Sequence, residues 1–151
     1  MDVKNLFDKT SFTELIERLN SLTAENKGLW GKMNVSQMLA HCKEAFKVPL
    51  MEKPPKRMLM GYLFGWLAKP LLYGPKPYKK SLPTAPNFII TDERNFEEER
   101  KQLIELVTKF HQSDPNGIGD KVHPFFGKMT AEQWGKGMWK HLDHHLQQFG
   151  T

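Results

Sequence analysis

GKMTAEQWGKGMWKHLDHHLQQFG, residues 127–150, is the stretch that decides the fold. Thr130 followed three positions later by Gln133 is a capping-box pattern, which predicts a helix that begins at this threonine. In such a helix, side chains spaced three and four residues apart share one face. The inward face then carries Trp134, Met138, His141, His145 and Phe149. Two histidines therefore lie one turn apart on a face that is otherwise apolar.

A similar pattern starts an earlier helix. GKMNVSQM at residues 31–38 matches GKMTAEQW at residues 127–134, with Asn34 as the cap and Gln37 three positions later. In the helix that follows, His41 points toward the centre of the protein. We interpret the two segments as helices started by the same device, because the repeat is too short to indicate a duplicated domain.

Two further helices complete the predicted fold. Residues 11–27 show a capping box in Ser11 and Glu14, then apolar residues at spacings of three and four, and Gly28 as a stop signal. Residues 93–112 place glutamates in the first turn, where the helix dipole favours them. The apolar face of this second segment consists of Phe96, Leu103, Val107 and Phe110.

The overall composition limits the kinds of fold and site that the chain can form. A chain of 151 residues with 39% hydrophobic residues suits one packed domain, residues 1–151, and without any sustained β alternation we predict an all-α fold. The single cysteine excludes a disulfide framework and a zinc site built on several thiolates. The first residues, MDVKNLFDKTSF, lack the apolar stretch of a signal peptide, so we expect a cytoplasmic protein.

Residues 51–86, called the strap below, carry the positive charge. They contain seven Lys or Arg against one acid, so their net charge of +6 exceeds the +5 of the whole chain. Seven of the ten prolines and all three tyrosines also lie in the strap. Because the charge is confined to a proline-rich connector, we do not expect a nucleic acid as partner.

The apolar part of the strap is MLMGYLFGWLAKPLLYG, residues 58–74. Two glycines, a lysine and a proline interrupt this run, and it is shorter than a membrane span requires. We expect a short buried helix followed by a proline-rich connector, and no membrane partner; the alternative is an amphipathic element bound to a surface. A connector of this length can cross the end of a helix bundle, which leaves the helices on its two sides parallel.

The histidines suggest a metal site. His141 and His145, one turn apart, and His41 from a facing helix can supply three neutral ring nitrogens to a divalent ion. Three protein ligands leave a position for water or substrate, as in catalytic metal sites. His144 lies about 100° round the helix from His145, so we do not expect it to bind the ion. The alternative is that these rings are only buried, hydrogen-bonded side chains.

GKMNVSQMLAHC together with HPFFGKMTAEQWGKGMWKHLDHHLQQFG resembles the DinB/YfiT-like superfamily of proposed metalloenzymes, and more closely its branch of uncharacterised bacterial domains. The resemblance implies an up-down-down-up four-helix bundle with a long crossover between the second and third helices. It also implies that His41, His141 and His145 bind a divalent metal ion, for which we expect zinc or nickel.

The resemblance extends to one more residue. It places Gln148, three positions after the last histidine ligand, in the site. The arginine–glycine pair often found between the two is Leu146–Gln147 here, so contacts that such an arginine makes are not expected in this chain. Some characterised relatives are transferases that use low-molecular-weight thiols, which implies a small-molecule substrate of that kind.

Two functional hypotheses follow. The first is a metal-dependent transferase or hydrolase in which the ion activates a thiol or a water. The strap would then cover the pocket, with Tyr62, Trp66 or Tyr73 in its wall. His123 would reach the mouth of this pocket or cap a helix. The second is a non-catalytic interaction domain, with or without a metal ion, whose strap docks a partner or an anionic membrane, and which could form a homodimer. An exposed apolar patch on residues 58–74 would favour this second hypothesis.

Overall fold

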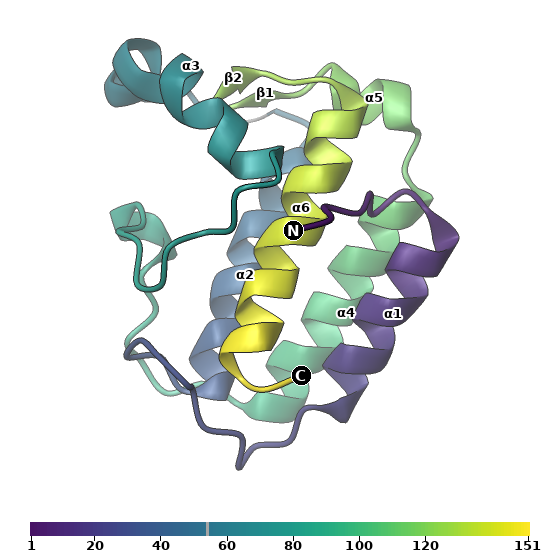
Figure 1. The fold of residues 1–151 in the computed structure, drawn as a ribbon, viewed down its shortest axis with the longest axis vertical. Coiled ribbons are helices and arrows are strands. Elements are labelled where there is room, and N and C mark those ends of the chain that lie inside the picture. The colour runs from purple at the N-terminus through teal and green to yellow at the C-terminus, as the bar shows by residue number, and fades with distance from the viewer. Residues whose placement is uncertain (54) are drawn as a thin grey trace.

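The computed structural model describes residues 1–53 and 55–151, and it is mostly helical (Figure 1). Across these residues six α-helices, one short 3-10 turn and one two-stranded sheet occur. The all-α expectation is therefore approximately right. The elements are α1 (Lys9–Ser21), α2 (Val35–Leu50), α3 (Leu59–Tyr73), η1 (Pro86–Phe88), α4 (Phe96–Gln112), α5 (Pro115–Gly119), β1 (Val122–His123), β2 (Gly127–Lys128) and α6 (Ala131–Gln148).

The long helices α1, α2, α4 and α6 lie side by side, and α2 runs parallel to α4 (Figure 1). Gln37 near the start of α2 donates to the carbonyl of Asp92, which precedes α4. Further along α2, Lys43 donates to Gln102 at 2.7 Å, well inside α4. Both helices therefore advance in the same direction. The strap and η1, which connect them, return the chain from one end of the helices to the other.

Helix α6 runs parallel to α1 and antiparallel to α2. Leu6, just before α1, donates its N–H to the carbonyl of Gly135 in the first half of α6. Arg18 in the last turn of α1 forms an ion pair of 2.7 Å with Asp143, far along α6. This ion pair joins the C-terminal halves of the two helices, and neither partner was selected for that role from the sequence.

Two of the three predicted capping boxes are confirmed, those at the starts of α2 and α6. The side chain of Asn34 accepts from the N–H of Gln37, and Gln37 accepts in return from the N–H of Asn34. The same pair of bonds links Thr130 and Gln133 at the start of α6. The glycine three residues before each cap adopts a positive φ, 81° at Gly31 and 76° at Gly127, which a residue with a side chain adopts only under strain.

The predicted bounds of α1 are wrong. The helix begins at Lys9, with Asp8 at the N-cap, so Ser11 lies buried within the helix and does not cap it. A turn in which Asp8 donates its N–H to the carbonyl of Asn5 sets this earlier start. The helix ends at Ser21, well before Gly28, because the backbone becomes extended at Leu22.

The core lies among the four long helices. The predicted apolar face of α4 is buried and forms part of one hydrophobic cluster with residues of α1, α2 and α6. One ion pair is enclosed beside it, since Lys43 of α2 meets Glu99 of α4 at 2.5 Å and both side chains are buried. Glu99 also accepts from Arg94. A carboxylate at this depth is tolerated because two cations pair with it.

Helix α3 forms as predicted within residues 58–74, but the expectation that it is buried is wrong. In the described part of the chain its fully buried residues are Gly61 and Gly65, whereas most of its large apolar side chains are exposed. Across those same residues, none of the helices combines the length and the apolar character needed to cross a membrane.

A small hairpin follows α5 and was not predicted. Strands β1 and β2 pair antiparallel, with Val122 opposite Lys128 and His123 opposite Gly127. The imidazole of His123 caps the turn, because its Nδ1 accepts from the N–H groups of Phe125 and Phe126 at 3.0 and 3.1 Å. Strands of two residues are too short to produce a recognisable alternation of apolar and polar side chains, so the sequence pattern did not indicate them.

Lys140 of α6 fastens the strap to the helices. Its side chain is only 1% exposed, and its ammonium donates to the backbone carbonyls of Leu71, Gly74 and Lys76 at 2.6, 2.8 and 2.6 Å. The same ammonium lies 4.5 Å from the ring centroid of Tyr78. The end of α3 and the first residues after it are therefore fixed to the middle of α6.

We expect Lys140→Gln to lower the free energy of unfolding by about 2 kcal/mol, because the three carbonyls lose their shared charged donor. The strap should then be cut by trypsin after Lys79 and Lys80 at lower protease concentration than in the wild type. Chemical denaturation and limited proteolysis followed by mass spectrometry measure the two effects.

Lys136→Gln, on the same helix, is the matched control, because its ammonium bonds only to Glu132 among the described residues. It should change neither quantity appreciably. Equal protection of the strap in wild type and Lys140→Gln would show that Lys140 does not hold it.

Candidate metal centre

Three histidines meet between α2 and α6. His141 and His145 are one turn apart on α6, and His41 faces them from α2 because the two helices run antiparallel. One ligand nitrogen from each of the three lies within 4.8 Å of the other two. The ring centroids are 4.7 to 5.2 Å apart. The structure thus brings together the three residues selected from helix phase.

The closest pair of ring nitrogens has a spacing that suits both shared binding of a metal ion and a direct hydrogen bond. His41 Nε2 lies 3.2 Å from His141 Nε2. Two nitrogens bound tetrahedrally to one zinc ion at 2.0–2.1 Å would be about 3.3 Å apart. An N–H···N hydrogen bond between neutral rings has a similar length. The cluster therefore has the spacing of a ligand set, and a hydrogen-bonded pair accounts for this one distance equally well.

Oxygen acceptors orient two of the rings. His41 Nδ1 is 2.9 Å from the carbonyl of Phe88, and His145 Nδ1 is 2.8 Å from Oε1 of Gln148. Because these oxygens only accept, each Nδ1 carries the proton and donates it. The Nε2 atoms of His41 and His145 are then left with free lone pairs. Metal-binding histidines are held in this way by a carbonyl or carboxylate on the other ring nitrogen.

Gln148 is itself fixed in place. Its Nε2 donates to the carbonyl of Trp30 at 2.7 Å, which leaves Oε1 to face His145. The approach requires a glycine at position 31, since a Cβ there would lie 2.7 Å from Nε2 of Gln148. The GKM segment before α2 therefore starts that helix and also admits the amide that orients a histidine on α6.

His141 has no such support from the described residues. Its Nδ1 is buried and has no hydrogen-bond partner among them. If the proton sits on Nε2, it is donated to His41 and Nδ1 is an unpaired acceptor; a cation on Nε2 would take the place of that proton. The donor set, three imidazoles with at least two free Nε2 lone pairs, fits a divalent ion of the zinc or nickel type.

Burial keeps the cluster neutral. It lowers the pKa of His41, lowers the pKa of His141 well below its ordinary value, and lowers the pKa of His145 to about 3. The neighbouring rings add to the shift for His141 and His145, because a second positive charge there would be repelled. Neutral imidazole is the form that binds metal ions, so none of the three rings has to lose a positive charge before it binds a metal ion at neutral pH.

His144 lies beside the cluster, outside the group of three. Its ring is 5.5 Å from that of Trp30 and 5.4 Å from that of Tyr78. Tyr78 donates to the carbonyl of Leu72, and burial raises its pKa. Lys80 lies over the ring of Trp30 at 4.7 Å. The strap thus contributes an aromatic and cationic border next to the histidines.

The strap residues selected from the sequence all lie on α3, outside the group of three histidines. Tyr62 and Trp66 are on the exposed side of α3, and Tyr73 is half-buried at its end. Tyr78, and Phe88 just beyond the strap, are the connector residues that reach the histidines. The sequence contained no signal for Phe88, because it acts through its backbone carbonyl, and Tyr78 was one of three tyrosines with no distinguishing context.

His123 acts in the hairpin turn. Burial lowers its pKa to about 4, and its ring lies 5.4 Å from that of Trp134.

Cys42, next to His41 in the sequence, is fully buried and touches the sulfur of Met38 at 3.8 Å. Burial raises the pKa of this thiol, so Cys42 stays protonated.

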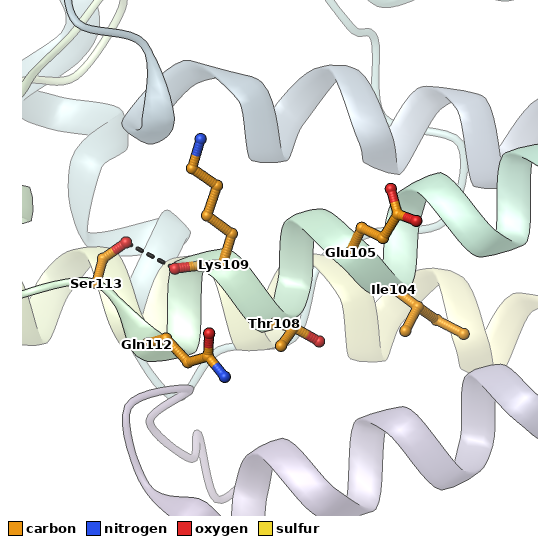
Figure 2. A pocket seen from close by; sticks show the side chains of 6 residues that line it. All are labelled: Ile104, Glu105, Thr108, Lys109, Gln112 and Ser113. Atoms are coloured by element: carbon orange, nitrogen blue, oxygen red, sulfur yellow. Dashed lines mark hydrogen bonds between the residues drawn. The ribbon is translucent and has the colours of Figure 1, made fainter.

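Two surface hollows occur away from the histidines. One, of about 450 Å³, lies on the outer side of α4, and Figure 2 shows its wall, which includes Glu105, Lys109 and Ser113. The other, of about 350 Å³, lies along α1 near Thr13. The wall of the first is made by one turn after another of a single helix, so it lacks converging polar groups from different elements. We assign no site to either hollow.

The geometry defines a mostly helical protein with a three-histidine cluster between two helices. The chain belongs to the family described as Protein of unknown function (DUF1569), whose model matches residues 2–151. No curated protein and no solved structure matches the chain. The family match does not itself connect the chain to the DinB/YfiT-like superfamily, so that relationship stays a hypothesis.

We expect His145→Ala to abolish high-affinity zinc or nickel binding, and His144→Ala to leave a stoichiometry of one ion per chain. The reason is that, of these two neighbouring residues, only His145 belongs to the cluster. Isothermal titration of the apoprotein, with elemental analysis of protein purified without an affinity tag, measures this. Equal losses in both variants would contradict the assignment of ligands by helix phase.

Gln148→Leu should weaken metal binding about 10–100-fold, since His145 loses the acceptor that orients its ring. Gln148→Glu keeps an oxygen acceptor for His145 but loses the bond to the carbonyl of Trp30, so it should recover only part of the affinity. Gln147→Leu is the matched control, as Gln147 bonds to Asp143 and is exposed. If Gln147→Leu weakened binding as much as Gln148→Leu, the orienting role would be lost.

Proposed function

We propose that this protein is a metal-dependent enzyme in which His41, His141 and His145 hold one divalent ion, zinc or nickel. The observation that carries the proposal is the pair of oxygen acceptors, Phe88 and Gln148, that turn two Nε2 atoms toward a shared point. A buried histidine with only a structural role needs one hydrogen-bond partner for its ring. Here the unused Nε2 lone pairs of His41 and His145 point toward the same place, and that arrangement favours a set of metal ligands.

The arrangement of the long helices, which position the three histidines, also supports the proposal. We propose that α1, α2, α4 and α6 form the up-down-down-up four-helix bundle of the DinB/YfiT type, in one domain over residues 1–151. The parallel run of α2 and α4 and the antiparallel run of α2 and α6 agree with that order. Bundles of this kind commonly place metal sites among side chains of facing helices.

A bound divalent ion would lower the pKa of a thiol or water in its open position, and so supply a nucleophile at neutral pH. The thiol would have to come from a substrate. Cys42 is fully buried against Met38 and protonated. A low-molecular-weight thiol with an anionic group fits the border of the cluster, where Lys80 lies over Trp30.

Thiol transfer is favoured over hydrolysis because the nearby carboxylates form ion pairs. Asp143 is held by Arg18 at 2.7 Å, and Glu44 is held by Lys47 at 2.5 Å. A hydrolase needs a base to accept a proton from the attacking water, and neither acid is free to do so. A thiol loses its proton more readily, so a thiolate forms near the ion with less help from a base.

The exposed face of α3 favours a second role, interaction with a partner. This was the feature that would distinguish a docking domain, and the structure shows it. It does not compete with the metal centre, because α3 packs on the half of α6 that precedes His141, where Leu72 meets Gly137.

The test uses protein loaded with Co²⁺, whose absorption spectrum reports its ligands. Adding a low-molecular-weight thiol should produce a thiolate-to-metal charge-transfer band in the wild type and in His144→Ala, and none in His145→Ala. Zinc- or nickel-loaded wild type should then accelerate the alkylation of that thiol by monobromobimane over the His145→Ala background.

Two results would overturn the proposal. One is a wild type that binds no divalent ion under conditions where it is folded. The other is a metal-loaded protein that shows neither the thiolate band nor any acceleration over His145→Ala. Hydrolysis of p-nitrophenyl acetate by the loaded protein, with no response to thiols, would favour the hydrolase instead.

A further inference from the structure

Helix α3 presents its large apolar side chains to solvent. Trp66 is 71% exposed and Leu59 is 76% exposed, although the helix is flanked by folded structure. The inward positions of the helix are instead taken by Gly61 and Gly65. This is the reverse of the usual distribution in a surface helix. The exposed side chains are Leu59, Met60, Tyr62, Leu63, Phe64, Trp66, Leu67 and Leu71.

The orientation of α3 is fixed by close packing of its backbone. A Cβ at Gly61 would lie 2.5 Å from the carbonyl oxygen of Phe125, and one at Gly65 would lie 2.2 Å from the same atom. Two turns after Gly65, Leu72 fits against Gly137 of α6, and Lys140 bonds to the carbonyls at the end of α3. The helix cannot rotate its apolar side inward without a clash, so the exposure is built into the fold.

Positive charge surrounds the apolar face. Residues 51–86 carry a net charge of +6, and their cations cluster at the two ends of α3. Lys53, Lys56 and Arg57 precede the helix, and Arg57 lies over the ring of Tyr62 at 4.3 Å. After the helix come Lys76, Lys79 and Lys80, each exposed.

We propose that α3 inserts its exposed face into the surface of an anionic lipid bilayer and lies parallel to it. Apolar side chains with tryptophan on one face and lysines beside it are the features of interfacial helices. Fifteen residues span about 22 Å of helix, which is too short to cross a bilayer but sufficient to lie in its interface. The expectation of no membrane partner depended on a buried helix, and that helix is exposed.

Charge favours a lipid surface over a second copy of the chain. A symmetric pair of α3 helices would bring two segments of net charge +6 against each other, with repulsion between them. Anionic headgroups neutralise those cations while the acyl region accepts the apolar side chains. Trp66 and Tyr62, which are amphipathic, suit the boundary between the two regions.

Docking through α3 would bring the border of the histidine cluster near the lipid surface. Tyr78 and Lys80 follow α3 in the strap, and Lys140 fixes the intervening residues to α6. The inference is independent of the metal, because its observations concern α3 and the cations of the strap. A protein without metal should therefore still bind the bilayer.

Co-sedimentation of the full chain with vesicles tests the proposal. Vesicles of phosphatidylcholine with phosphatidylserine should bind the protein, and vesicles of phosphatidylcholine alone should bind it at least about tenfold more weakly. High salt should reduce binding, since the charges are at the surface. Emission of Trp66 should shift to shorter wavelength on binding, and Trp66→Phe should bind but lose most of that shift.

Matched variants distinguish membrane binding through the apolar face of α3 from a general effect of the protein's charge on binding. Leu63→Glu with Trp66→Glu should lose binding, whereas Leu29→Glu, on an exposed side chain in the loop before α2, should retain it. Lys53→Glu with Lys56→Glu should weaken binding, whereas Lys9→Glu with Lys101→Glu, equal in charge but on α1 and α4, should do so much less. All the altered side chains are exposed, and circular dichroism verifies the fold.

Three results would overturn the proposal. The first is a protein that does not sediment with anionic vesicles. The second is a dimer by light scattering that Trp66→Glu disperses, without vesicle binding, which would assign α3 to a second copy. The third is vesicle binding that Leu63→Glu with Trp66→Glu leaves intact, which would show adsorption by charge at another surface.

Discussion

The rest of the site depends on the burial of three imidazole rings between α2 and α6. A ring nitrogen removed from water is costly unless it is paired, so each buried ring demands a specific partner. The carbonyl of Phe88 and the amide of Gln148 meet this demand for His41 and His145. The bond to Phe88 fixes where η1 lies, and a further bond, from Nε2 of Gln148 to the carbonyl of Trp30, holds that turn at the end of α6. Segments distant in sequence are thus positioned by the polar atoms of the rings.

Much of this arrangement could be predicted because it depends on local patterns. A capping box sets the first residue of a helix, and the first residue sets the phase of every later side chain. From Asn34 and Thr130 the inward positions of His41, His141 and His145 follow directly. The ligand set was therefore accessible from the sequence. The acceptor carbonyl of Phe88 was not, because every residue has a carbonyl and only the path of the connector selects one.

The errors have a common physical cause. An apolar segment was expected to be buried, but Gly61 and Gly65 allow the backbone of α3 to approach Phe125 so closely that the large side chains must point outward. Composition reports how apolar a helix is and does not report which face meets its neighbour. Similarly, Ser11 has the chemistry of a cap, but the turn at Asp8 started α1 earlier. In both cases residues outside the pattern, a packed neighbour for α3 and a preceding turn for α1, overrode a local preference.

The ammonium of Lys140 is shared by three carbonyls at the end of α3, two of which belong to groups that a helix leaves unpaired at its C-terminus. The charge that completes α3 thus comes from another helix, one residue before His141. A force that lifts α3 must break three bonds together or pull on the turn of α6 that carries His141. The two helices are mechanically coupled at this point, and a pull on α3 is transmitted through Lys140 to the turn of α6 that carries His141.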